Sequence, residues 1–203
     1  MKKQRLGFNI VLLGQNASGK ETQTRILEKK YALKSVETGV YTRTLLKEKS
    51  KNGDLARRTA GKGGALAVKL LKEFLVREIK NHPKGKDLIF LGGPRLKPEA
   101  QLLKKLLDQK KQDFIAFYIT LPDKEVYRRS LLRAKDKNTK AIYKVFDNKK
   151  IIAARLKYYK NQVSKTVKYF QSLKKMKLIN GNQPISKVTE DILGAIKEYK
   201  KIR

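Results

Sequence analysis

A glycine-bounded loop that ends in a lysine is the first stretch of this sequence whose residues could do chemistry. An apolar run at 8–13 precedes the loop and a helical pattern at 22–30 follows it. The spacing G-x-x-x-x-G-K between a strand and a helix is typical of a phosphate-binding loop. Backbone N–H groups and the helix N-terminus favour an anion there, and Lys20 can reach the outer phosphates. The predicted phosphate-binding residues are Gly14, Gln15, Asn16, Ala17, Ser18, Gly19, Lys20, Glu21 and Thr22.

Glu21 is the one departure from this pattern, because a serine or threonine is expected directly after the lysine. Two interpretations are open. The carboxylate could serve as a Mg²⁺ ligand in place of the missing hydroxyl. Alternatively, Glu21 is only an acid at a helix N-terminus, where the helix dipole favours negative charge.

Several arginines follow predicted strands or share helix faces, and ligands of parallel sheets bind at the carboxyl ends of the strands. Arg43 lies one turn into the helix that follows a Thr-Gly pair, and Arg95 follows the strand at 87–91. Arg129 and Arg133 are four residues apart, which puts them on one helix face. With Arg155, these side chains could form a clamp, since the planar guanidinium suits bidentate phosphate contacts.

The order of apolar runs predicts an α/β fold in three layers, with a central five-stranded parallel sheet and helices on both faces. The predicted strands are 8–13, 31–36, 87–91, 114–121 and 176–181. The predicted helices are 22–30, 39–46, 66–79, 98–111, 123–133, 148–173 and 185–199. A polar stretch at 49–62, rich in Gly and Lys, is expected to be mobile.

The composition bounds the class of protein. At 203 residues, the chain is predicted to form a single domain over 1–203. It has no cysteine, which excludes disulfides and thiolate zinc sites and fits a reducing compartment. No apolar run reaches the length of a membrane span and no signal-peptide pattern opens the chain, so a cytoplasmic protein without membrane contact is expected. The protein is also expected to be a monomer.

The charge is strongly positive, with 50 Lys and Arg against 18 Asp and Glu, a net charge of +32. Such a field attracts nucleotides, nucleic acids and other anions without choosing among them. Two interpretations of this charge are open: a solvated lysine-rich surface, or a surface that binds nucleic acid. The RGG, RS and RNP-type patterns of nucleic-acid-binding proteins are absent.

At this point the sequence resembles a known family. The pattern Gly14…Gly19-Lys20-x-Thr22-Gln23, Glu37-Thr38-Gly39-x-x-x-Arg43, Gly92-x-Pro94-Arg95, the pair Arg129 and Arg133, and Lys144-x-x-Asp147…Arg155-Leu156…Tyr159 is similar to that of adenylate kinase and its nucleoside monophosphate kinase relatives. The order and the spacing both agree. The resemblance covers nearly the whole chain and implies the P-loop NTPase fold.

The resemblance implies transfer of the γ-phosphate of ATP to a nucleoside monophosphate, with ATP and Mg²⁺ as cofactors and AMP as the expected acceptor. The loop, with Arg129, would bind ATP. The residues implied for the monophosphate are Thr38, Gly39, Arg43, Gly92, Arg95, Glu99, Arg133 and Arg155. The catalytic residues implied are Lys20, Arg95, Arg129, Arg133 and Arg155. Residues 40–66 would be the monophosphate-binding insertion and 134–146 a short lid without zinc.

The sequence departs from the family pattern at informative positions. Leu91 replaces the aspartate that would hold Mg²⁺ through water, and Val40 replaces an acid. Phe146 replaces one acid of a pair, Lys144 replaces an arginine, and Glu99 replaces the glutamine that reads the acceptor base. One interpretation is an active enzyme in which Glu21 holds the metal and Glu99 contacts the base. The other is a catalytically impaired protein whose basic surface binds RNA or another polyanion.

Overall fold

The five predicted strands are all present and form one parallel sheet. The computed structural model describes residues 3–62, 65–137, 143 and 147–202. The strands are β1 (Asn9–Gly14), β2 (Leu33–Glu37), β3 (Asp87–Leu91), β4 (Phe114–Thr120) and β5 (Met176–Asn180). Their order across the sheet is β2-β3-β1-β4-β5, and each neighbouring pair is parallel. The predicted fold class is therefore confirmed.

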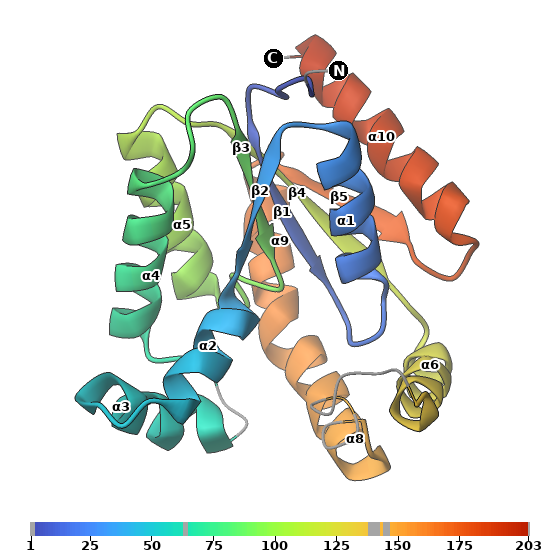
Figure 1. Cartoon of the computed structure of the whole chain (residues 1–203). Helices are drawn as coiled ribbons and strands as arrows, with labels where there is room; N and C mark the ends of the chain where they lie inside the picture. Colours follow the sequence, from blue (N-terminus) through green and yellow to red (C-terminus); the bar gives the residue numbers. More distant parts are fainter. Residues whose placement is uncertain (1–2, 63–64, 138–142, 144–146, 203) are drawn as a thin grey trace.

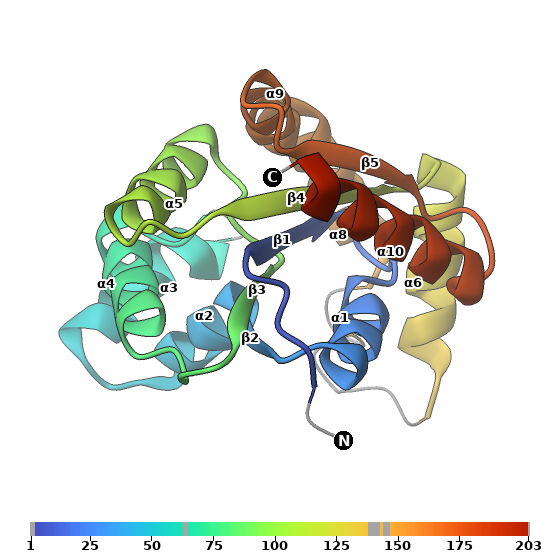
Figure 2. The same cartoon turned by 90° about the horizontal axis from the view of Figure 1, so that it is seen from above.

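The helices cover both faces of this sheet (Figures 1 and 2). Those that flank the sheet are α1 (Lys20–Lys30), α4 (Val68–Lys80), α5 (Lys97–Gln109), α9 (Ser164–Ser172) and α10 (Ile185–Ile202). Alternate residues of β1 divide between two cores, as expected when side chains of a strand point to opposite faces. Val11 and Leu13 pack in the core under α4, α5 and α9, whereas Ile10 and Leu12 pack in the core under α1 and α10.

Three further helices lie at the carboxyl end of the sheet: α2 (Thr38–Lys47), α6 (Asp123–Lys135) and α8 (Lys149–Tyr158). In Figure 1 they gather around the end of the sheet opposite to the two chain termini. The helix predicted at 148–173 is continuous but contains a π-helical turn, Tyr159–Val163, between α8 and α9. The sequence pattern alone did not predict this turn.

The polar stretch predicted at 49–62 contains a helix, α3 (Lys51–Thr59), followed by a 3₁₀ turn (Ala60–Lys62). Ser50 caps this helix, because its hydroxyl accepts a hydrogen bond from the Gly53 N–H at 3.1 Å. Arg57 donates to the carbonyl oxygens of Leu46 and Glu48, at 3.0 and 2.8 Å, and so ties α3 to the end of α2. The described residues of 40–66 are thus largely helical, and the role of this segment as a monophosphate-binding insertion stays a prediction.

The predicted lid at 134–146 lies mostly outside the described residues. The structure describes 134–137 and Tyr143 of that segment, while Lys144 and Phe146 lie outside the described part of the chain. In the residues that are described, none of the helices combines the length and the apolar character needed to cross a membrane.

A buried aspartate anchors the N-terminal segment to the amino end of the sheet. The carboxylate of Asp87 is 4% exposed and accepts hydrogen bonds from Arg5 Nη2, at 2.7 Å, and from the N–H groups of Leu6 and Gly7, at 2.8 and 3.1 Å. The substitution Asp87→Ala would leave these donors without their acceptor. We therefore expect it to lower the free energy of unfolding by about 3 kcal/mol in urea titrations.

The matched control is Asp54→Ala, which removes an exposed ion pair with Arg57. Exposed pairs contribute little, so this variant should stay within about 1 kcal/mol of the wild type. An equal loss of stability in the two variants would show that Asp87 is no anchor.

Candidate phosphate-binding site

The phosphate-binding loop connects β1 to α1 with the backbone geometry that its glycines allow. Gly14 has φ 152° and Gly19, which precedes the first turn of α1, has φ 88°. A Cβ atom on Gly14 would lie 2.7 Å from both the Ile119 carbonyl oxygen and Ser18 Oγ, so a larger residue does not fit. Gln15 ties the loop to the end of β4, because its Oε1 accepts a hydrogen bond from the Leu121 N–H at 2.8 Å.

Lys20 is folded back over this loop. Its Nζ donates to the Gln15 carbonyl oxygen at 2.6 Å and to Ser18 Oγ at 3.2 Å. Burial lowers the pKa of Lys20 to about 7, and the positive charges of Arg95, Arg133 and Arg155 act in the same direction against the opposing charge of Glu21. The arginines repel the protonated Lys20 amine, so an anion bound beside it would stabilise its charged form.

We call Lys20, Arg95, Arg133 and Arg155 the cationic centre, because each of the three arginines acts electrostatically on Lys20. Arg155 is also affected: burial lowers its pKa, and Arg95 and Arg133 add to that effect. The four side chains come from α1, from the turn after β3, from α6 and from α8. The structure thus brings together four of the five residues that the sequence proposed as catalytic. Such a concentration of positive charge is suited to a polyanion.

Arg95 is held in place by hydrogen bonds of its backbone N–H, its backbone carbonyl oxygen and its side chain. Its Nε donates to the Gly92 carbonyl oxygen at 2.7 Å, and its own carbonyl oxygen accepts from Thr166 Oγ1 at 2.9 Å. Gly92 has φ 74°, a conformation that favours glycine, and the Gly93–Pro94 peptide bond is cis. The turn between β3 and α5 therefore presents the Arg95 guanidinium at the carboxyl edge of the sheet.

Glu99 has a structural task that the sequence did not predict, and its contact with the acceptor base stays a prediction. Its carboxylate is buried, at 4% exposure, and Oε2 accepts from the N–H groups of Arg95 and Leu96, at 2.7 and 3.1 Å. These bonds cap the N-terminus of α5, where an acid is favoured. Burial raises the pKa of Glu99, and the two backbone hydrogen bonds oppose that rise. Glu99 therefore positions Arg95 rather than facing outward.

Arg133 is held by one residue that the sequence singled out and one that it missed. Its Nε donates to Asp147 Oδ2 at 2.7 Å, and the Asp147 side chain is fully buried. Its guanidinium carbon lies 3.9 Å from the centre of the Tyr143 ring, which is a cation–π contact. The Tyr143 hydroxyl donates to Glu21 Oε1 at 2.6 Å and so joins the lid segment to the loop. No spacing rule identifies Tyr143 from the sequence.

Arg129 is set apart from the cationic centre by its own partners. Its Nε contacts Glu125 Oε1 at 2.5 Å, and its Nη2 donates to the Gly181 carbonyl oxygen at 3.1 Å. Arg128 shares the same carboxylate, and the two arginines lower the pKa of Glu125 to about 2. Arg129 is thus oriented along α6 toward the end of β5.

Three of the residues predicted to hold the monophosphate, Thr38, Gly39 and Arg43, lie in the first turns of α2. A Cβ atom on Gly93 would lie 3.0 Å from Thr38 Oγ1, so the start of α2 sits directly against the turn that carries Arg95. Gly39 is close to Arg43, whose Nη1 lies 3.3 Å from the position of a Cβ on that glycine. Arg43 also acts electrostatically on Tyr143. The first turns of α2 therefore face the same region as the cationic centre.

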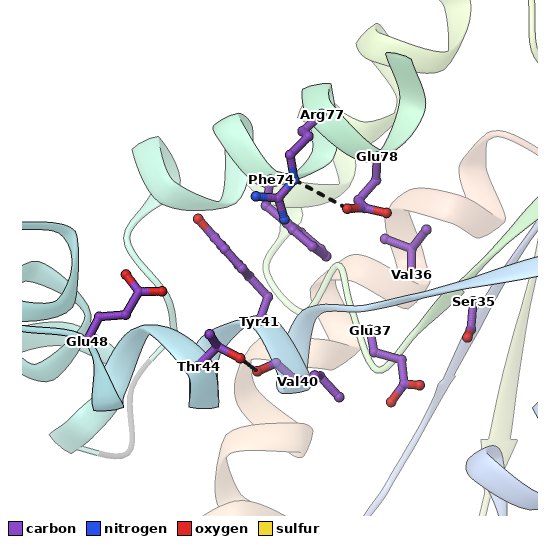
Figure 3. Close-up of a pocket in the computed structure, with 10 residues that line it drawn as sticks. All are labelled: Ser35, Val36, Glu37, Val40, Tyr41, Thr44, Glu48, Phe74, Arg77 and Glu78. Atoms are coloured by element: carbon purple, nitrogen blue, oxygen red, sulfur yellow. Dashed lines mark hydrogen bonds and ion pairs between the residues drawn. The ribbon is translucent and has the colours of Figure 1, made fainter. Parts of the chain in front are cut away.

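A separate pocket of about 380 Å³ lies between α2, α4 and the end of β2 (Figure 3). The Tyr41 ring stacks on Phe74 there, with ring centres 4.4 Å apart. Its lining also includes Glu37, Glu48 and Glu78, but no member of the cationic centre. Arg77 also lines the pocket, but the three carboxylates outnumber this one guanidinium, which disfavours a phosphate there.

Few residues are placed to ligate a metal ion. In the part of the chain that the structure describes, no group of three or more His, Cys, Asp or Glu could hold one. Leu91 ends β3 as a buried apolar residue. Glu21 is the exposed carboxylate next to Lys20, and among the described residues only Tyr143 donates a hydrogen bond to it, at Oε1. Mg²⁺ needs one or two carboxylates besides nucleotide phosphates, and Glu21 fits that requirement.

The sheet order, the loop between β1 and α1 and the cationic centre at the carboxyl edge define a P-loop protein of the α/β NTPase fold. A family model described as Adenylate kinase matches residues 12–175, which is most of the chain. This chain therefore belongs to the adenylate kinase family.

Curated relatives agree over nearly their whole length. An adenylate kinase from Bacteroides fragilis is 29% identical over 190 residues, covering 93% of this chain and 98% of the relative. The adenylate kinase of Parabacteroides distasonis is 30% identical over 192 residues, with 94% and 96% covered. That of Azobacteroides pseudotrichonymphae is 31% identical over 190 residues, with 93% and 97% covered.

Proposed function

We propose that this chain is an ATP-dependent nucleoside monophosphate kinase that transfers the γ-phosphate of ATP to AMP and releases two diphosphates. The observation that carries the proposal is the cationic centre, which lies between the ATP-type loop and the first turns of α2. The acceptor of this reaction is already an oxyanion, so no general base is needed. Catalysis then consists of positioning two phosphates and neutralising the charge that the transferred group carries.

The roles of the side chains follow from their places around the sheet edge. The loop with Lys20 would bind the phosphates of ATP, and Arg129 would contact ATP from α6. Thr38, Gly39 and Arg43 from α2, with Gly92 and Arg95 after β3, would bind the monophosphate. Arg133 and Arg155 would stabilise the transferred group between them.

When bound, Mg²⁺ would supply positive charge beside the phosphates of ATP. Glu21 is the residue that we propose as its protein ligand, given the position of its carboxylate directly after Lys20. Tyr143 would then share Glu21 with the metal, since its hydroxyl donates to Oε1.

The pair Glu21 and Tyr143 offers a test of this metal role. We expect Glu21→Gln to raise the Mg²⁺ concentration that gives half-maximal turnover about tenfold, because a neutral amide is a poorer ligand than a carboxylate. Tyr143→Phe removes the competing hydroxyl but keeps the carboxylate. It should leave the Mg²⁺ requirement unchanged or lower it. An unchanged requirement in Glu21→Gln would refute the metal role.

The proposed function is tested by incubating the protein with ATP and Mg²⁺ and each of AMP, CMP, UMP, GMP and dAMP. Formation of diphosphates is followed by chromatography, and a parallel series replaces ATP with GTP. We expect the fastest turnover with ATP and AMP. Absence of turnover with every acceptor would contradict the proposal, and faster turnover with another monophosphate would correct the acceptor.

A further inference from the structure

The long helix formed by α8, the π-helical turn and α9 belongs to a segment that contains no acid. Residues 148–189 include no Asp or Glu, although the chain as a whole has 18. The basic residues of this segment are Lys149, Lys150, Arg155, Lys157, Lys160, Lys165, Lys168, Lys174, Lys175, Lys177 and Lys187. No acid is interspersed within the segment itself, although acids from other parts of the chain pair with Lys160, Lys175, Lys177 and Lys187.

Most lysines of this helix are solvated and lack an acidic partner. Lys160 pairs with Asp123 from α6 at 2.5 Å. The others are exposed and form no ion pair with any described residue. They are Lys149, Lys150, Lys157, Lys165 and Lys168, which we call the lysine face.

The lysine face is one side of the helix. An α-helix rotates by ~100° per residue, and the π-helical turn contains about one residue more than an α-helical turn. With this extra residue taken into account, the five lysines fall within roughly a third of the helix circumference. They extend over ~29 Å along the axis. Arg155, the arginine of the same helix, is half-buried and acts on Arg95 and Arg133 on another side. The helix thus presents one side to the cationic centre and a different side to solvent.

The chemistry of the lysine face limits its partner. The exposed large apolar side chains of the described residues are Val40, Val68, Val76, Leu132, Leu178, Ile185 and Ile202, and none belongs to α8 or α9. A membrane surface is normally bound by basic residues together with apolar ones, so this face suits a hydrated polyanion instead. Its members are lysines, which act as point charges on phosphates and lack the fork with which arginine reads guanine.

We propose that the lysine face binds the phosphate backbone of a nucleic acid strand without sequence preference. Phosphates follow one another every ~3.4 Å along each strand of a duplex, so ~29 Å of helix is long enough to meet several of them. This inference does not rest on the proposed kinase activity, because the lysine face and the cationic centre occupy different sides of the helix.

The test compares two variants with the same change of charge. The first carries Lys157→Gln, Lys165→Gln and Lys168→Gln in the lysine face. The matched control carries Lys69→Gln, Lys72→Gln and Lys80→Gln on α4, whose lysines are likewise exposed. Binding of labelled 30-nucleotide oligo(U), oligo(dT) and a duplex is followed by fluorescence anisotropy at several salt concentrations, with and without saturating ATP.

We expect the first variant to reduce the salt dependence of log K by about two for single strands, since each phosphate contact contributes about 0.7. Its affinity should fall at least tenfold, while the control stays within about twofold and turnover of both variants is unchanged. RNA and DNA should bind equally, and saturating ATP should not displace them. Equal losses in the two variants would attribute binding to the overall net charge and overturn the proposal. So would displacement by ATP, or stronger binding to phosphatidylserine vesicles than to the oligonucleotides.

Discussion

Replacing Arg95 with alanine is expected to lower kcat/KM for the monophosphate about 10²- to 10³-fold, the usual effect of removing one preorganised charge from a phosphoryl-transfer site. Arg95 ends the turn after β3 and acts on both Lys20 and Arg155. Its loss therefore removes charge from the middle of the cationic centre. Steady-state kinetics with AMP as the varied substrate measure the effect.

The variant should remain folded, because the Arg95 side chain is exposed and, among the described residues, its hydrogen bond is to the Gly92 carbonyl oxygen alone. We expect its melting temperature to change by only a few degrees. Lys97→Ala is the matched control: it removes an exposed positive charge two residues further on and should change kcat/KM less than twofold. Arg95→Lys should recover only part of the activity, since an ammonium cannot make a bidentate contact. Wild-type kinetics in Arg95→Ala would exclude Arg95 from the site.

The second large effect is expected for Lys20→Met, which should lower kcat/KM about 10³-fold without destabilising the nucleotide-free protein. Burial and the repulsion of three arginines lower the pKa of Lys20 to about 7. Methionine keeps most of the side-chain volume and removes that repulsion. Loss of the bonds to Gln15 and Ser18 partly offsets the gain. Turnover assays and thermal unfolding without nucleotide measure the two consequences.

The low pKa of Lys20 also predicts a pH effect with a definite sign. The folded pKa lies below the ordinary value of 10.5, so the unfolded chain binds this proton more tightly. The contribution of Lys20 to stability therefore increases as pH rises from about 7 toward 10.5, and it is lost as pH falls through 7.

Phosphates beside Lys20 raise its pKa again, so Lys20 should take up part of a proton when ATP binds at pH 8. Calorimetric titrations in two buffers with different ionisation enthalpies measure this uptake. We expect it in the wild type and in Lys29→Met, an exposed lysine on the same helix, and not in Lys20→Met. Equal heats in the two buffers for the wild type would show that Lys20 is already fully protonated.

Local sequence patterns were sufficient for the framework of this protein. Each of the five predicted strands overlaps an observed one, and the unbroken apolar runs of β1 and β3 are buried on both faces, as such runs must be. The loop from Gly14 to Lys20 follows from spacing along a continuous chain, as does the placement of Arg95 just after a strand. These features depend on residues that are close in the sequence, so sequence patterns are able to predict them.

Only the tertiary structure decided which side chains meet. The Glu99 carboxylate accepts hydrogen bonds from the N–H groups at the start of α5, which have no acceptor within the helix, and so it caps that helix. Arg129 turns toward Glu125 and Gly181, although it shares a predicted helix face with Arg133. The bond between Tyr143 and Glu21 joins residues 122 positions apart. Contacts of this kind depend on how helices pack around the sheet, and no local spacing encodes that packing.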